Sequence, residues 1–148
     1  MDSPCKTTGQ GFAENTQPEW AVGRSASYNV WRVLTPAPQD VPLALCDARS
    51  FTAEDLVPAD AVFDDPKDSN KIIFSFEGLT VRANPDHRWM YFHDMSIDEV
   101  IVFKSFDSDP NYPCFVPHSA FTAPKYPEGT QARISIEMRA TVYWKNKV

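Results

Sequence analysis

The stretch ARISIEMRATVYW, residues 132–144, alternates polar and apolar side chains over most of its length. Successive side chains of a β-strand point to opposite faces, so this period of two indicates a strand. Its apolar face would carry Ile134, Ile136, Met138, Ala140 and Val142, and its polar face Arg133, Ser135, Glu137, Arg139 and Thr141. We expect the apolar face to pack on a core. A densely polar face is also typical of a strand on the outside of a sheet.

Other short runs of β-branched and aromatic residues recur from Tyr28 onward between turn signals, as in a sandwich or barrel. These candidate strands are residues 28–34, 42–48, 71–76, 79–84, 87–92, 98–106 and 114–121. Residues 51–60 open a short helix with Thr52 as its N-cap, and residues 64–70 form a charged, exposed turn. Thirteen prolines against five glycines suit connections between short strands. The sequence therefore predicts an all-β domain over residues 26–148, preceded by an N-terminal arm over residues 1–25.

Large apolar side chains from these strands should form the core of the domain. The predicted core residues are Trp31, Leu43, Leu45, Phe74, Trp89, Phe92, Val100, Val102, Ile134 and Ile136. The stretch HRWMYFHD, residues 87–94, has aromatic side chains on both faces, which indicates burial on both sides. We expect about eight strands in total.

Length and charge narrow the class of protein. At 148 residues, with 43% hydrophobic and 23% charged residues, the chain has the size and composition of one globular domain. The formal net charge of -6 argues against nucleic acid or an anionic membrane as a partner. No apolar run approaches the roughly 20 residues of a membrane helix, and residues 1–17 contain no apolar stretch typical of a signal peptide. We therefore expect a cytoplasmic protein with three reduced cysteines, of which Cys46 is buried.

The three histidines, His87, His93 and His118, do not predict a metal site by themselves. On an extended strand His87 and His93 would lie about 20 Å apart, too far to share one ion. His93 and Asp94 are adjacent, so on a strand they would point to opposite faces, and the chain contains no His-x-Asp or His-x-Glu triplet. Each histidine is more often a hydrogen-bonded structural residue than a ligand. The sequence also lacks a GxSxG elbow and a glycine-rich phosphate loop.

Five segments, taken together and in order, resemble one family. They are YNVWRVLTPAPQDVPLALCDARS (28–50), NPDHRWMYF (84–92), DEVIVFKSFDS (98–108), PHSAF (117–121) and RISIEMRATVYW (133–144). This pattern resembles the fungal hydroxylase/desaturase family of secondary-metabolite clusters, which is similar to the gibberellin desaturases and to AsaB- and CmcJ-type oxygenases. The resemblance covers residues 24–144. It implies a double-stranded β-helix of the jelly-roll or cupin-like type, and dependence on Fe(II) and 2-oxoglutarate.

The resemblance also implies roles for single residues. His118 falls where the family has its distal iron histidine, and Arg133 with Ser135 falls on the Arg-x-Ser pattern that holds the far carboxylate of 2-oxoglutarate. An arginine suits that role because its planar fork can bind a carboxylate with two hydrogen bonds, and the polar strand face would point it into the barrel. Arg139, on the same face, is the second choice.

The family's His-x-Asp motif has no counterpart here, since the 27 residues before Tyr28 contain no histidine. The chain thus looks like the C-terminal half of such an oxygenase, with an incomplete or remodelled double-stranded β-helix. We expect no iron or other cofactor in the isolated chain, with His118 as the ligand if any metal binds. Fe(II) and 2-oxoglutarate would bind if a partner completed the site. Separately, unpaired strand edges predict that the chain associates with another polypeptide, either a second copy in a homodimer or a heteromeric oxygenase partner.

These observations predict a role in natural-product biosynthesis. The stretches HRWMYFHD and RISIEMR would wall a pocket for an apolar small molecule. The candidate acid–base groups are His87, His93, His118, Lys104 and Asp107. They could catalyse an isomerisation, cyclisation or elimination without a cofactor, or an oxidation if a partner supplied the missing iron ligands. The alternatives are a non-catalytic subunit that stabilises a full-length oxygenase, and a truncated fragment.

Overall fold

The computed structural model describes residues 23–145, and within them nearly all regular structure is β-strand. Eight strands and one 3-10 turn follow in chain order, so the all-β prediction and the expected number of strands are confirmed. The predicted N-terminal arm, residues 1–25, lies almost wholly outside the described residues. Only its last residues are seen, and Ser25 already begins the first strand.

A three-stranded antiparallel sheet forms the first layer, in the order β6-β1-β8. Its strands are β6 (Ile101–Asp107), β1 (Ser25–Val33) and β8 (Ser135–Tyr143). Asn29 at the middle of β1 lies opposite Phe103 of β6 and opposite Arg139 of β8. A β-bulge between Ser27 and Tyr28 shifts the register with β6. The sheet therefore aligns the polar face of β8 with the side of β1 that carries Ser27, Asn29 and Trp31.

A second antiparallel sheet has the order β5-β2-β7 and consists of short strands. They are β5 (Trp89–Tyr91), β2 (Leu43–Cys46) and β7 (His118–Ala120). In this sheet Leu45 lies opposite Met90 on one side and opposite His118 on the other.

The core lies between these two sheets. Its buried members are Trp31, Val33, Leu43, Met95, Ile101 and Phe103, and Leu45 and Val116 pack against them. Trp31, Leu43 and Leu45 were predicted as core residues, and the structure confirms them. The other seven predicted core residues are wrong for this chain, since they are exposed: Phe74, Trp89, Phe92, Val100, Val102, Ile134 and Ile136.

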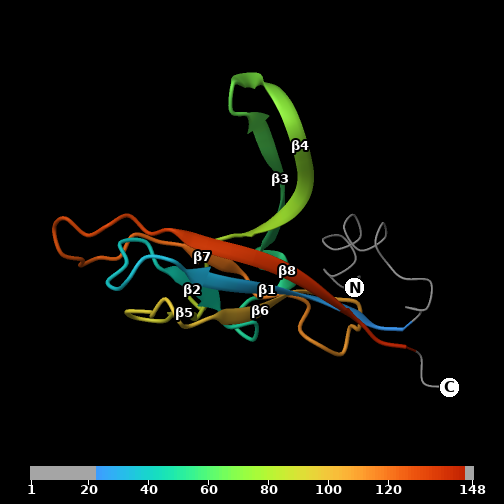
Figure 1. Cartoon of the computed structure of the whole chain (residues 1–148). Helices are drawn as coiled ribbons and strands as arrows, with labels where there is room; N and C mark the ends of the chain where they lie inside the picture. Colours follow the sequence, from blue (N-terminus) through green and yellow to red (C-terminus); the bar gives the residue numbers. More distant parts are fainter. Residues whose placement is uncertain (1–22, 146–148) are drawn as a thin grey trace.

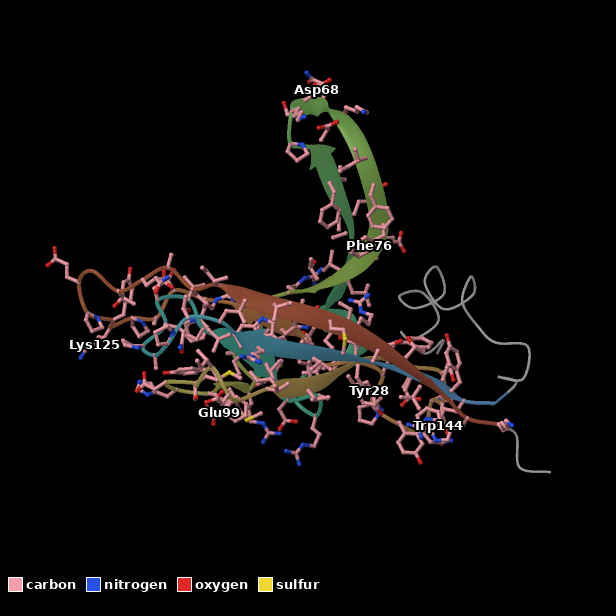
Figure 2. All side chains as sticks on the ribbon, viewed as in Figure 1. Tyr28, Asp68, Phe76, Glu99, Lys125 and Trp144 are labelled. Carbon is pink, nitrogen blue, oxygen red and sulfur yellow. The ribbon has the colours of Figure 1, made fainter. Side chains whose placement is uncertain are left out.

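A long hairpin rises away from the two sheets (Figure 1). It is called here the arm, and it is distinct from the N-terminal arm predicted over residues 1–25. It pairs β3 (Leu56–Asp65) with β4 (Asp68–Val81), and its charged tip lies within the turn predicted over residues 64–70. Figure 2 shows Asp68 at the tip and Phe76 lower on the arm. The strands predicted over residues 71–76 and 79–84 belong to one strand, which ends at Val81, and β3 replaces residues 56–60 of the helix predicted over residues 51–60. Only the 3-10 turn Ala53–Asp55 remains helical, with Thr52 as its N-cap.

The arm carries exposed aromatic residues on one face. The rings of Phe63, Phe74 and Phe76 lie within about 6 Å of one another between centroids. The cross-strand pairing of Phe63 with Phe74 and of Ala61 with Phe76 explains why they share a face.

Two further predictions concern the cysteines and membrane helices. Cys46 is free and buried, as expected. Cys114 is disulfide-bonded, so the expectation of reduced thiols is wrong for that residue. Among the described residues, no helix has the length and apolar character needed to cross a membrane.

Candidate functional site

A pocket of about 600 Å³ lies where the base of the arm meets the two sheets. Such a volume is within the usual range for small-molecule sites. Its apolar lining comes from β4, β5, β6 and the segment before β7, and includes Phe76, Leu79, Val81, Trp89, Phe106, Phe115, Val116 and Pro117. Its polar lining includes Ser27, Glu77, Thr80, Ser105, His118, Ser119, Arg139 and Thr141. The predicted walls, residues 87–94 and 133–139, contribute Trp89 and Arg139, and β4 adds a wall that the sequence did not indicate.

His118 is held in one orientation on the wall of this pocket. Its ring packs 4.6 Å from the Phe103 ring between centroids, and its Nδ1 lies 3.0 Å from the carbonyl oxygen of Val116. A carbonyl oxygen can only accept, so Nδ1 carries the proton and donates it. In the neutral ring, Nε2 then keeps its lone pair. That nitrogen can accept a proton or ligate a metal, and a hydrogen bond from the other ring nitrogen is typical of metal-ligating histidines.

Arg139 lies on the opposite wall, on β8. Its Nε donates a hydrogen bond of 3.1 Å to Oδ1 of Asn29, and Nδ2 of Asn29 donates one of 2.9 Å to Glu137. In the next pair on the same face of the β1–β8 ladder, the hydroxyls of Ser27 and Thr141 lie 2.9 Å apart. Arg139 and Thr141 thus place the polar face of β8 on the pocket side of the sheet, and both faces of the strand carry exposed residues.

Ser135 begins β8 and Arg133 lies two residues before it, and neither belongs to the lining of the pocket. The Arg133 side chain donates through Nη1 to the Ser135 hydroxyl, and its guanidinium carbon lies 5.4 Å from the centre of the Trp31 ring. Its Nε is buried without a hydrogen-bond partner, and no carboxylate pairs with its guanidinium among residues 23–145. The backbone N–H of Arg133 donates to Asp40, which anchors the strand end. A half-buried guanidinium with an unused donor at its buried Nε and an adjacent hydroxyl fits a ligand carboxylate.

The structure places His87 and His93 away from this pocket. The His87 side chain is only 2% exposed, and its Nε2 lies 3.3 Å from Oδ2 of Asp55. Hydrogen bonds to Asp55 from the Asn84 amide and the Thr52 backbone lower the pKa of this carboxyl well below its usual range.

His93 is 75% exposed, and its Nδ1 lies 2.8 Å from the carboxylate of Asp94. The expectation that His93 and Asp94 point to opposite faces of a strand is wrong. Strand β5 ends at Tyr91, and Asp94 has a positive φ of 50°, which turns the chain.

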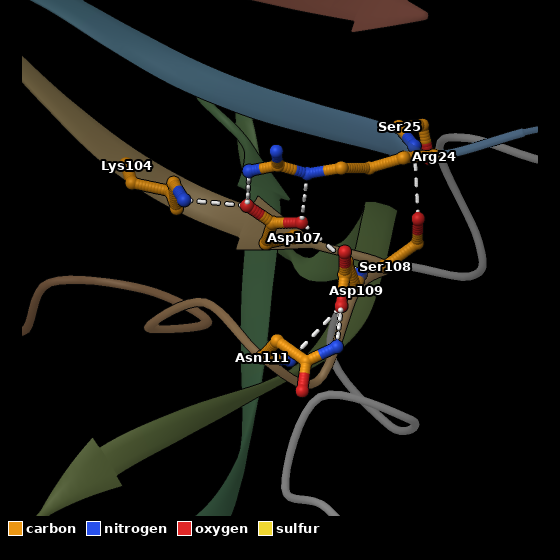
Figure 3. Close-up of polar contacts among 7 residues, drawn as sticks. All are labelled: Arg24, Ser25, Lys104, Asp107, Ser108, Asp109 and Asn111. Carbon is orange, nitrogen blue, oxygen red and sulfur yellow. Dashed lines mark hydrogen bonds and ion pairs between the residues drawn. The ribbon is translucent and has the colours of Figure 1, made fainter. Parts of the chain in front are cut away.

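Lys104 and Asp107 belong to an ion cluster at the end of β6, not to the pocket lining (Figure 3). The fully buried carboxylate of Asp107 accepts hydrogen bonds from Arg24 at 2.6 and 2.9 Å and from Lys104 at 2.5 Å. Burial acts to raise the pKa of Asp107, but the hydrogen bonds from Arg24 and Lys104 outweigh it and lower the pKa to about 2. This cluster ties the start of β1 to the end of β6. The predicted catalytic roles of Lys104 and Asp107 stay predictions.

Residues 23–145 do not by themselves form a complete iron site. Among the residues that the structure describes, no group of three histidine, cysteine, aspartate or glutamate side chains could hold a metal ion. His118 can supply one nitrogen ligand, and the two-histidine, one-carboxylate arrangement needs three ligands.

Sequence reasoning missed Asn29, which positions Arg139, and the contribution of β4. The signal for Asn29 was present, since a polar residue in the apolar run YNVWRVL shares a face with Trp31. No comparable signal existed for Phe76 or Glu77, because only the tertiary position of the arm brings them to the pocket.

Comparisons with known proteins show which family the chain resembles in sequence. Residues 7–143 match the family described as "Oxidoreductase/YMDC permease-like domain". Hydroxylase/desaturase asaB of Aspergillus flavus is 36% identical over 132 aligned residues, which cover 84% of this chain and 57% of that protein. Hydroxylase/desaturase efuI of Hormonema carpetanum is 35% identical over 130 aligned residues, which cover 80% of this chain and 41% of that protein.

The fold is similar to that of a solved structure, the iron and alpha-ketoglutarate-dependent endoperoxidase NvfI. The TM-score is 0.72 at 27% sequence identity, and the match covers 96% of this chain and 53% of that chain. The jelly-roll architecture expected from the sequence is thereby confirmed. The chain spans about half the length of the relatives it matches. The sequence pattern, the paired sheets and these matches together show that the chain belongs to the fungal hydroxylase/desaturase family of oxidoreductases.

Proposed function

We propose that this chain acts in secondary-metabolite biosynthesis as part of a cytoplasmic Fe(II)/2-oxoglutarate oxygenase that oxidises an apolar small molecule. The observation that carries the proposal is the orientation of His118, whose Nε2 lone pair is available on the wall of a largely apolar pocket. Arg133 and Ser135 support it, since they offer a separate place for a carboxylate such as that of 2-oxoglutarate. His118 is the one iron ligand that the described residues supply in this proposal.

The remaining iron ligands would come from a partner polypeptide, either a second copy or a full-length oxygenase. In the described part of the chain, β7 is an edge strand of its sheet and β8 is an edge strand of the other. A strand added to β7 would lie directly beside His118. The outer face of β6 and β8 is also apolar and exposed, with Val102, Ile136 and Met138 each more than half exposed. Such a face is typical of a surface that another polypeptide covers.

Cofactor-free catalysis is the second candidate, because His118 and Glu77 both line the same pocket. A neutral histidine can take a proton at neutral pH, and a carboxyl group could return one. This candidate would not need Arg133 or Ser135, which lie outside the pocket lining.

The deciding experiment incubates the purified chain with pathway intermediates, with and without Fe(II), 2-oxoglutarate and a full-length paralogue. We expect turnover only when all three are present, and we expect His118→Ala to abolish it. Turnover by the chain alone without iron would favour cofactor-free catalysis. Turnover by the paralogue that His118→Ala leaves unchanged would favour a non-catalytic subunit. No turnover under any condition, with aggregation of the isolated chain, would favour a truncated fragment.

The role of Arg133 is tested separately by 2-oxoglutarate binding in calorimetry. We expect Arg133→Lys to weaken binding although the charge is retained, because an ammonium cannot form the bidentate fork. Arg32→Lys is the matched control, since Arg32 is exposed on β1.

A further inference from the structure

Asn29 fixes the orientation of the Arg139 side chain in the pocket. Asn29 is fully buried between Glu137 and Arg139 and hydrogen-bonds to both. A carboxylate can only accept and a guanidinium can only donate, so the amide of Asn29 has one orientation that satisfies both neighbours. The Asn29 oxygen therefore faces Nε of Arg139.

This arrangement leaves the terminal nitrogens of Arg139 for another partner. Arg139 has five N–H donors, and its hydrogen bond to Asn29 uses only the one on Nε. No carboxylate oxygen lies within 4.0 Å of the Arg139 guanidinium among residues 23–145, although Glu137 is two residues away. Arg139 is an exposed residue that lines the pocket, so its planar Nη1/Nη2 fork is open to a ligand that enters there.

The composition of the pocket indicates what the fork would bind. Arg139 is the only arginine or lysine in the described lining, and much of the remaining surface is apolar. A single guanidinium matches a singly charged, planar carboxylate, whereas a phosphate usually requires several donors or cations. Arg133 is six residues away along the strand, at about 20 Å, so the two arginines cannot share one small carboxylate group.

We infer that Arg139 binds a carboxylate on the apolar ligand of this pocket, so that the substrate class is an apolar organic acid. The inference rests on the proposed function, because it names the substrate class of the same pocket. Ser27 and Thr141 form the next pair on the same face of the β1–β8 ladder, and their hydroxyls would lie beside the bound carboxylate. The apolar part of the ligand would lie against Phe76, Leu79 and Trp89.

The test compares 2-naphthoate with the neutral 2-naphthamide as probes, by isothermal titration calorimetry on the full chain. We expect naphthoate to bind at least tenfold more tightly than naphthamide. In Arg139→Gln this preference should disappear while the affinity for naphthamide is kept, which also shows that the pocket is folded. Arg139→Lys should keep part of the preference, because it keeps the charge without the fork. The control Arg32→Gln removes an exposed arginine of β1 and should leave both affinities unchanged.

Equal affinity of the two probes for the unaltered chain would overturn the inference. So would a naphthoate preference that survives Arg139→Gln, or one that Arg133→Gln abolishes instead. The assay uses neither iron nor turnover, so its outcome is independent of the test of oxygenase activity. A preference for naphthoate in a chain that shows no oxidation would leave the carboxylate site standing and remove only the oxygenase proposal.

Discussion

Replacement of Asp107 by asparagine tests whether the ion cluster at the end of β6 is structural. Asp107→Asn keeps the shape of the side chain but removes the charge that Arg24 and Lys104 contact. The pKa of Asp107 is lowered from 3.8 to about 2 in the folded protein. At 1.36 kcal/mol per pKa unit, this shift corresponds to about 2 kcal/mol of stability at pH 7. We expect Asp107→Asn to lose at least that amount, or roughly 4–8 °C in Tm.

The effect has a defined pH dependence. A carboxyl whose pKa is lower in the folded than in the unfolded state stabilises the protein above its unfolded pKa, and loses this contribution as pH falls through the folded pKa. The contribution of Asp107 should be complete above about pH 5 and should fall below about 1 kcal/mol at pH 2.5. The difference between the unaltered protein and Asp107→Asn should therefore shrink over that range.

The assay is urea denaturation of both proteins at pH 7, 4 and 2.5, followed by tryptophan fluorescence. Asp98→Asn is the control, because Asp98 is exposed. Equal stability of Asp107→Asn and the unaltered chain at pH 7 would refute the reasoning, as would a difference that stays constant down to pH 2.5. A loss of turnover in Asp107→Asn without any loss of stability would instead support the catalytic role predicted from the sequence.

Three further predictions concern the core, the buried thiol and the arm. Trp31→Ala should lower the free energy of unfolding by about 3–5 kcal/mol, because it empties a buried position between the sheets; a loss below about 1 kcal/mol in urea denaturation would contradict the assigned core. Cys46 should react with a thiol reagent only after unfolding, since it is 1% exposed; equal rates in native and denatured protein would show that it is not buried. Phe74→Ser on the arm should change stability by less than about 1 kcal/mol and reduce self-association in light scattering, because the ring is half-exposed; a large loss of stability would show that the arm packs on the body.

Strand β8 shows what alternation in a sequence can and cannot predict. The pattern of ARISIEMRATVYW located the strand and divided its side chains correctly between two faces. It assigned the apolar face to the core, yet Ile136 and Met138 are exposed and the polar face lies on the pocket side. Alternation defines the two faces, but what covers each face depends on tertiary neighbours. The exposed apolar face is the one that we propose a partner covers.

The arm shows a second limit. The sequence predicts a short helix over residues 51–60 and a charged turn over residues 64–70, yet residues 56–65 form β3, although Pro58 and the acidic residues of LVPADAVFDD are unfavourable for a central strand. The structure accommodates them because β3 has only one neighbour, β4, and proline is tolerated on such an edge. Glu77 and Gly78 indicated a break between two strands, but β4 continues through both.

Part of the candidate site could be predicted because its residues lie on short motifs. PHSAF located His118, and the polar face of RISIEMR located Arg133, Ser135 and Arg139. The separation of His87 and Asp107 from the pocket could not be predicted, because their positions depend on contacts with Asp55 and Arg24, which are distant in sequence. The sequence shows which titratable residues are present but not which residues they contact in the folded chain.

The β3–β4 arm has a consequence for how the molecule unfolds. Among the strands that the structure describes, β3 and β4 pack mainly against each other, whereas β1 is paired on both sides and contributes to the core. An isolated two-stranded hairpin is only marginally stable in water. The arm can therefore open locally while the two sheets stay folded, and its amide hydrogens should exchange with solvent before those of β1. The chain then contains two cooperative units, so the unfolding free energy measured by tryptophan fluorescence describes the sheets, and the wall that β4 gives the pocket can be lost while the rest of the molecule remains native.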